Sequence, residues 1–243
     1  MPARREMKKE ARELIRTTKP HPCFTGLVFV LIIWLISYLT AKINGGPIEL
    51  DMKELYAGNI NSAFRLHMYE PNFLSSLLVT AFQFITTILG FGFTAYAVKV
   101  SRKRPADIGT LFDGFAMFFR VIWMYIIIAV YVFLWSLLFI IPGFVASYKY
   151  AMAPYLLIDH PEWRAIDCIR ESKRIMKGHK AELFVLDISF IGWYILSLIR
   201  PLQVYIQPFS RITHAIYYNN LVGYKEAAPL DPSENSDKKP WEY

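Results

Sequence analysis

Cysteine and histidine are scarce in this chain. Its 243 residues include two cysteines, Cys23 and Cys168, and five histidines. The cysteines form no Cys-x-x-Cys pair and the histidines form no cluster, so no residue pattern indicates a metal site. Cys168 falls in a loop that we expect in the reducing cytoplasm, where structural disulfides are rare. We therefore predict no disulfide, no metal and no cofactor.

Charged residues make up 19% of the chain and are missing from three long stretches, Pro22–Ala41, Pro71–Val98 and Val121–Tyr148. Hydrophobic residues make up 54%, against roughly 45–50% in ordinary soluble domains. A helix of about 20 apolar residues crosses a hydrocarbon core of about 30 Å. Each stretch is long enough to do so. This clustering excludes a disordered chain and argues against a soluble globule.

Further crossings are expected in the second half of the chain. Pro142 and Gly143 predict a helix end and a tight turn inside the third apolar stretch. A later apolar run, 183–199, is interrupted only by Asp187. The predicted fold is therefore all-α, a polytopic transmembrane helical bundle with amphipathic helices on the inner surface. The transmembrane domain covers 22–222, with about six spans near 22–41, 71–98, 121–141, 144–158, 183–199 and 205–222.

The positions of lysine and arginine predict the orientation of these spans. Seven basic residues precede the first span, five lie between the second and third, and six lie between Asp159 and Glu182. The loop from Lys42 to Glu70 has three. Because cytoplasmic loops retain positive charge, the first three groups belong inside, which requires residues 144–158 to cross. Six spans then place both termini in the cytoplasm.

Two segments outside the membrane have a recognisable character. Residues 1–21 form a basic amphipathic helix, with Met7, Ala11, Leu14 and Ile15 at helical spacing, whose expected role is to anchor the chain to the membrane surface. Residues 223–243 combine prolines and acids in polar surroundings and are predicted to be disordered.

Eight short motifs follow one another from the end of the third apolar stretch onward. They are Ile141-Pro142-Gly143, Tyr150, Ala153-Pro154-Tyr155, Glu171-Ser172, Met176-Lys177-Gly178, Leu183-Phe184, Ser189-Phe190-Ile191-Gly192-Trp193 and Tyr217-Tyr218. In this order they resemble those of a bacterial family of integral membrane proteins that is catalogued as a domain of unknown function. The resemblance runs from about Met7 to Val222, and it implies a multi-pass protein of the bacterial cytoplasmic membrane and no assigned reaction. The chain is also distantly similar to the membrane domain fused to some glycerophosphodiester phosphodiesterases, whose catalytic domain has no counterpart here.

Four ionisable residues fall within the predicted spans: Lys149, Asp187, Arg211 and His214. Such residues are costly in a membrane and therefore indicate function. Lys149 lies nine residues before Ile158 and Asp187 six after Ala181, which places them about 13 and about 9 Å from the inner ends of their helices. The same arithmetic adds Arg211 and His214 to one polar layer. This layer is interpreted as a site for an anion or lipid phosphate, or as a structural ion pair.

These patterns favour a non-catalytic integral membrane protein that binds lipid or another protein as an accessory. The alternative is a small transporter or exporter that uses the polar layer and helices interrupted by proline. The expected partners are anionic lipid headgroups at the inner face and a membrane protein, with no nucleic acid. No nucleophile motif or second carboxylate indicates an enzyme.

Overall fold

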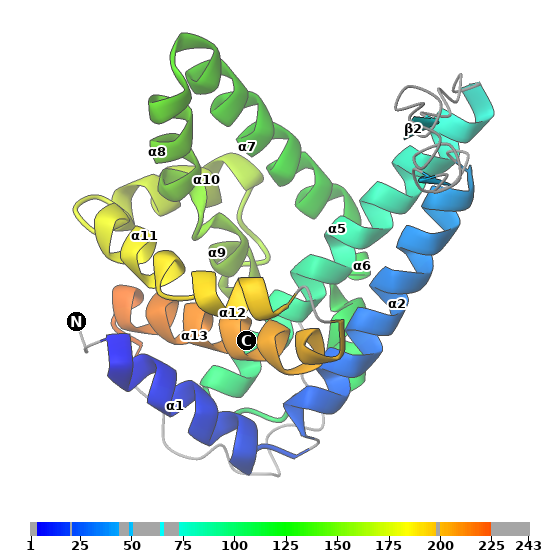
Figure 1. The fold of residues 1–243 in the computed structure, drawn as a ribbon. Coiled ribbons are helices and arrows are strands. Elements are labelled where there is room, and N and C mark those ends of the chain that lie inside the picture. The colour runs from blue at the N-terminus through cyan, green and yellow to red at the C-terminus, as the bar shows by residue number, and fades with distance from the viewer. Residues whose placement is uncertain are drawn as a thin grey trace. The chain divides into compact units, whose positions relative to one another are not determined.

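The computed structural model of the chain describes residues 4–19, 21–43, 49–50, 64–65, 73–197 and 200–224. Helices dominate these residues, so the predicted all-α class is confirmed (Figure 1). The strands found there have two residues each, β1 (Glu49–Leu50) and β2 (Phe64–Arg65). They pair antiparallel, with Glu49 opposite Arg65.

The chain divides into two compact units. The first contains Met1–Phe29 and Ile88–Tyr243, and the second contains Val30–Thr87. Helices α2 (Pro22–Ile43) and α5 (Phe73–Ser101) contribute residues to both. Within the second unit, the rings of Trp34 and Tyr38 stack 6.1 Å apart on α2. The polar side chains considered below belong to the first unit.

Among the described residues, three helices are long and apolar enough to cross a membrane, namely α2, α5 and α7 (Phe118–Leu138). Their 22, 29 and 21 residues give lengths of about 33, 44 and 32 Å, against a hydrocarbon core of about 30 Å. They coincide with the three charge-free stretches. The structure therefore agrees with the sequence on these three spans, and the total of six stays a prediction.

Helix α7 turns back into α8 (Ile140–Tyr150) at Phe139, whose backbone is extended. The predicted turn at Pro142 and Gly143 is therefore wrong by about one helical turn. Both residues lie in the first turn of α8, where proline is tolerated because its missing N–H has no helical partner. Gly143 instead serves the packing of the hairpin, because a Cβ there would collide with Ser136 of α7.

The fourth and fifth predicted spans are not continuous helices. Segment 144–158 is divided between α8 and α9 (Ala153–Asp159), with a turn at Ala151 and Met152. Segment 183–199 is divided between α11 (Lys180–Ile188) and α12 (Ile191–Leu196), with a turn at Ser189 and Phe190. Apolar composition predicted the segments but gave no sign of either break.

Helix α1 (Arg4–Thr17) has the amphipathic face that its spacing predicts, and buries Met7, Ala11, Leu14 and Ile15. That face packs on α13 (Arg200–Val222), alongside which α1 runs in Figure 1. The prediction of a membrane-surface anchor is therefore corrected, because protein already covers the apolar residues. Helix α13 is continuous through Pro208 and is largely buried from Ile206 to Asn219.

Pro208 and Gly26 bring α2 and α13 into close contact. Pro208 has no N–H to offer the carbonyl of Val204, four residues earlier in α13. A Cβ on Gly26 of α2 would lie 2.7 Å from that carbonyl oxygen and 3.1 Å from Cδ of Pro208. The absence of a side chain at Gly26 therefore sets the approach of the two helices.

The remaining elements join these helices. The 3-10 helix η1 (Ile108–Phe112) and α6 (Asp113–Ala116) connect α5 to α7. Helix α10 (Ala165–Ile175) packs on α7, α8 and α9 and buries Cys168 and Ser172. The predicted disordered tail lies outside the described residues except for Gly223 and Tyr224, and the N–H of Tyr224 donates to the carbonyl of Asn219 at 2.8 Å.

Candidate functional site

Asp187 and His214 form a hydrogen-bonded pair inside the first unit. Nε2 of His214, on α13, lies 2.7 Å from Oδ1 of Asp187, on α11. The hydroxyl of Tyr148, on α8, donates to the other carboxylate oxygen at 2.9 Å. The side chain of Asp187 is 33% exposed and that of His214 is 18% exposed. Three helices thus converge on one carboxylate.

The second ring nitrogen of His214 contacts the backbone of its own helix. Nδ1 lies 2.8 Å from the carbonyl oxygen of Ser210, which accepts hydrogen bonds and cannot donate one. Both ring nitrogens of His214 therefore face oxygen atoms, one of the Ser210 carbonyl and one of the Asp187 carboxylate.

The break between α11 and α12 places the ring of Phe190 beside that of His214. It turns the ring of Phe190 into the core, where it is fully buried and lies 6.0 Å from the His214 ring, centroid to centroid. Nζ of Lys8 on α1 lies 3.9 Å from the centroid of the same phenyl ring. It also donates to the carbonyl of Ser189 at 2.8 Å. Burial lowers the pKa of Lys8, and the nearby Arg12 and Arg4 lower it further.

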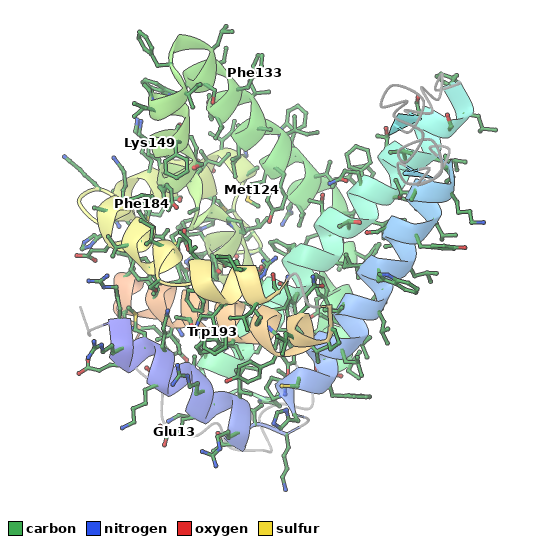
Figure 2. All side chains as sticks on the ribbon, in the orientation of Figure 1. Glu13, Met124, Phe133, Lys149, Phe184 and Trp193 are labelled. Atoms are coloured by element: carbon green, nitrogen blue, oxygen red, sulfur yellow. The ribbon has the colours of Figure 1, made fainter. Side chains whose placement is uncertain are left out.

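A cavity of about 350 Å³ opens in front of the pair. Helices α8 and α11, labelled in Figure 2 at Lys149 and Phe184, supply much of its wall. Asp187 is the carboxylate of this lining and His214 is its histidine. The other side chains are mostly apolar or aromatic. The lining comprises Phe144, Ser147, Tyr148, Ala151, Met152, Tyr155, Leu183, Asp187 and His214.

The other two residues of the predicted layer lie elsewhere. Nζ of Lys149 stands 4.3 Å from the ring centroid of Trp135 on α7, in cation–π contact. Nη1 of Arg211 donates to the buried hydroxyl of Thr94 on α5 at 2.8 Å. Neither lines the cavity. The structure thus brings together Asp187 and His214, with Tyr148 in the place expected for Lys149.

Sequence reasoning missed a buried polar cluster at the end of α5. Nη1 and Nη2 of Arg102 donate to both oxygens of Asp159 at 2.6 and 2.7 Å, and Tyr218 donates to the same carboxylate at 2.7 Å. Nε of Arg102 donates to Asn219 at 3.0 Å. The Arg102 side chain is 7% exposed. This cluster ties α5, α9 and α13 together. In the sequence, Arg102 and Asp159 look like ordinary loop charges, and Tyr218 and Asn219 fall in the last predicted span.

A second cavity, of about 780 Å³, lies between α5, α6 and the start of α7. Its polar wall includes Lys99 and Asp113, whose Nζ and Oδ2 lie 3.1 Å apart. Arg120, also in the lining, donates to the carbonyl of Pro161. Lys99 and Asp113 are therefore paired with each other, and Arg120 is bonded to a backbone carbonyl. Across the described ranges, no three His, Cys, Asp or Glu side chains are grouped so as to hold a metal ion.

The fold and site define a helical protein with three helices able to cross a membrane and a polar pair beside a cavity. Residues 137–225 match a family described as "Protein of unknown function (DUF975)". This match confirms the predicted resemblance over the segment from the end of α7 to the end of α13. The matched segment contains Tyr148, Asp187 and His214.

The match does not extend to residues 7–136, so the resemblance over that part stays a prediction. No curated protein and no solved structure matches the chain. The distant likeness to the membrane domain of glycerophosphodiester phosphodiesterases is likewise a prediction that these comparisons do not support.

Proposed function

We propose that this chain is a non-catalytic, multi-pass protein of the bacterial cytoplasmic membrane that acts as an accessory by binding lipid. The observation that carries the proposal is the exposed apolar end of the α7–α8 hairpin. Ile140 and Ile141 are 84% and 76% exposed, and Phe133 projects from α7 (Figure 2). Soluble proteins rarely leave a contiguous apolar patch of this kind in water. Lipid chains are its natural cover.

The exposed basic residues of α1 and α10 support a preference for anionic headgroups at the inner face. Helix α1 packs its apolar side on α13 and leaves Arg4, Arg5 and Lys9 exposed. Helix α10, which packs on both helices of the hairpin, carries Arg170 and Arg174 on its exposed side. Each basic residue near an anionic surface contributes about 1 kcal/mol. We place both termini in the cytoplasm on the basis of this charge distribution.

The test is native mass spectrometry of lipids retained from nanodiscs of equal parts phosphatidylethanolamine and phosphatidylglycerol. The wild type is expected to enrich phosphatidylglycerol. A variant with Arg4→Gln, Arg5→Gln and Lys9→Gln is expected to lose much of that enrichment. The control variant, Lys225→Gln, Lys238→Gln and Lys239→Gln, removes the same charge from the tail and should retain it. Equal enrichment in all three proteins would overturn the headgroup preference. If a protein co-purifies in stoichiometric amount, a partner chain and not lipid covers the exposed end of the hairpin.

A small transporter is the second candidate, and the observation that favours it is the Asp187–His214 pair beside two broken helices. Discontinuous helices and intramembrane carboxylate or histidine groups occur in proton-coupled transporters. Proteoliposomes that contain a pH-sensitive dye test this function. Proton movement in response to an imposed membrane potential, lost in Asp187→Asn, would favour transport over a purely accessory role.

A further inference from the structure

We propose that the cavity in front of Asp187 binds the ammonium group of an organic cation and exchanges it for the proton held by the Asp187–His214 pair. This inference goes beyond the lipid contact proposed for the hairpin and the basic helices. It rests on the charge of the cavity, on the aromatic side chains of its wall and on the hydrogen bonds of the pair.

The charge of the lining favours a cation. Asp187 supplies the carboxylate of the cavity, and no lysine or arginine is among the described residues that line it. Nε2 of His214 lies 2.7 Å from an oxygen of that carboxylate. An anion would meet the carboxylate with no fixed positive charge to offset it, since Lys149 and Arg211 are engaged with Trp135 and Thr94. A cation can replace the imidazolium as the counter-ion.

Aromatic side chains complete the site. Phe144, Tyr148 and Tyr155 line the cavity together with Met152 and Leu183. Aromatic rings attract alkylammonium groups through their negative faces. Phe144 and Tyr148 are held by edge contacts to Phe184, with centroid distances of 5.7 and 5.9 Å. A volume of about 350 Å³ suits a small ligand.

The titratable and charged groups on the elements around the pair are Tyr148 on α8, Tyr155 on α9, Tyr194 on α12, Lys8 on α1 and Arg211 on α13. Tyrosine, lysine and arginine keep one charge state between about pH 5 and 8, whereas histidine changes its state there. Lys8 and Tyr194 are also bonded to Ser189 and Ser210.

The exchange balances in charge and protons. We take the pair before binding to hold two protons, one for each of the two oxygen atoms that the ring nitrogens of His214 face, and to have no net charge. When an ammonium group takes the place of the imidazolium beside Asp187, His214 gives up one proton to the solvent and keeps the other on Nδ1. The carboxylate and the bound ammonium are then neutral together, and His214 is neutral. One cation enters and one proton leaves, so raising the pH strengthens binding.

The ammonium has two plausible chemical sources, the headgroup of an aminophospholipid or a free amine. Phe144 lines the cavity and is 52% exposed, and Phe184 and Ile188 on α11 are also exposed apolar residues. The mouth of the cavity is therefore apolar, which suits a ligand that arrives from the bilayer. Both sources present the same ammonium chemistry to Asp187.

The experiment titrates hexyltrimethylammonium into the wild type in phosphatidylglycerol nanodiscs by isothermal calorimetry, from about pH 5.5 to about pH 8. This probe keeps its charge at every pH. The apparent Kd of the wild type is expected to fall about tenfold per pH unit while the pair is protonated. Two buffers of different ionisation enthalpy should report the release of one proton per cation. Binding that releases no proton, or a Kd independent of pH, would overturn the exchange.

Variants locate the site. Asp187→Asn is expected to abolish specific binding, and His214→Gln to retain binding without its pH dependence. Tyr148→Phe removes the hydroxyl that donates to Asp187 and is expected to change the apparent Kd while leaving its dependence on pH. It keeps the proposal testable if Asp187→Asn does not fold, because an apparent Kd equal to that of the wild type would overturn the site. Asp167→Asn and His160→Gln, at exposed positions that pair with Arg170 and Glu162, serve as matched controls and should behave as wild type. Unchanged binding in Asp187→Asn would overturn the proposal.

Nanodiscs that also contain phosphatidylethanolamine distinguish the two sources. If the lipid headgroup is the ligand, this lipid will compete with the probe in the wild type and weaken its apparent affinity. If a free amine is the ligand, the affinity will not change. Asp187→Asn should keep the phosphatidylglycerol enrichment of the proposed function, because the basic residues of α1 are intact. Failure of one proposal is therefore distinguishable from failure of the other.

Discussion

His214 and Asp187 are 27 residues apart in the chain, yet Nε2 of the histidine lies 2.7 Å from Oδ1 of the aspartate. Their helices, α13 and α11, meet where α11 ends and the chain turns at Ser189. The pair is partly buried, and the carbonyl of Ser210 fixes the second ring nitrogen of His214. Each side chain therefore depends on the other as its polar partner in a partly buried place.

This dependence predicts strong coupling between the two positions. We expect Asp187→Asn and His214→Gln each to lower the free energy of unfolding, and the double variant to cost less than their sum, with an interaction energy of roughly 0.5–3 kcal/mol. Denaturant unfolding in micelles measures the free energies of unfolding of the wild type, the two single variants and the double variant, which together form a double-mutant cycle. The same cycle on the exposed pair of His179 and Glu182 should give a value near zero. Additive effects at Asp187 and His214 would contradict the coupling.

Gly26→Ala is expected to destabilise the contact between α2 and α13. The added methyl group would stand 2.7 Å from the backbone oxygen of Val204, which cannot move away as a flexible side chain would. Overpacking of this kind costs about 1–3 kcal/mol. Gly90→Ala on α5 is the control, because no other heavy atom lies within 4 Å of its added carbon. Thermal unfolding of the two variants compares them, and equal midpoints would refute the close approach.

Arg102→Gln is expected to cost about 3–5 kcal/mol in the free energy of unfolding, because it leaves the carboxylate of Asp159 buried without its charge partner. Arg170→Gln removes an arginine that is 75% exposed and should change stability little. Unfolding by denaturant, followed by circular dichroism, separates the two. A loss in Arg102→Gln no larger than that in Arg170→Gln would show that the cluster does not hold α5, α9 and α13 together.

Cys168 should resist thiol reagents until the pH is high. Burial raises the pKa of its thiol to about 11, and the nearby Asp167 adds to the shift. Only the thiolate reacts, so in a Cys23→Ser background the labelling rate should rise about tenfold per pH unit from pH 8 to about 10. In the unfolded chain the thiol has its ordinary, lower pKa and loses its proton at a lower pH than the buried thiol does. The fold therefore becomes less stable as the pH rises above about 9. Rapid labelling by maleimide at neutral pH would contradict the burial of Cys168.

Much of the architecture follows from local sequence pattern. Charge-free runs of sufficient length identified α2, α5 and α7, because helix length and bilayer thickness are fixed quantities. Helical spacing gave the four buried residues of α1. Depth arithmetic placed Asp187 and His214 at one level, and they meet. These predictions depend on composition and period alone.

The partners of these groups could not be predicted because they depend on where helices break. The level of Lys149 was calculated for a continuous helix from 144 to 158, whereas the turn at Ala151 and Met152 sends Lys149 to Trp135 and Tyr148 to Asp187. The apolar face of α1 was assigned to lipid, but α13 covers it. Tertiary packing made these choices, and no local pattern encodes them.

The short length of α8 has a consequence for how the chain enters a membrane. Its 11 residues reach about 16 Å, roughly half of a hydrocarbon core of about 30 Å, whereas α7 can cross alone. Because Gly143 lets α8 lie directly against Ser136, the two helices form one hairpin before α9 begins. We therefore expect a nascent chain that ends at residue 138 to insert with its last residues on the far side, and the later synthesis of α8 to supply the return arm of the hairpin.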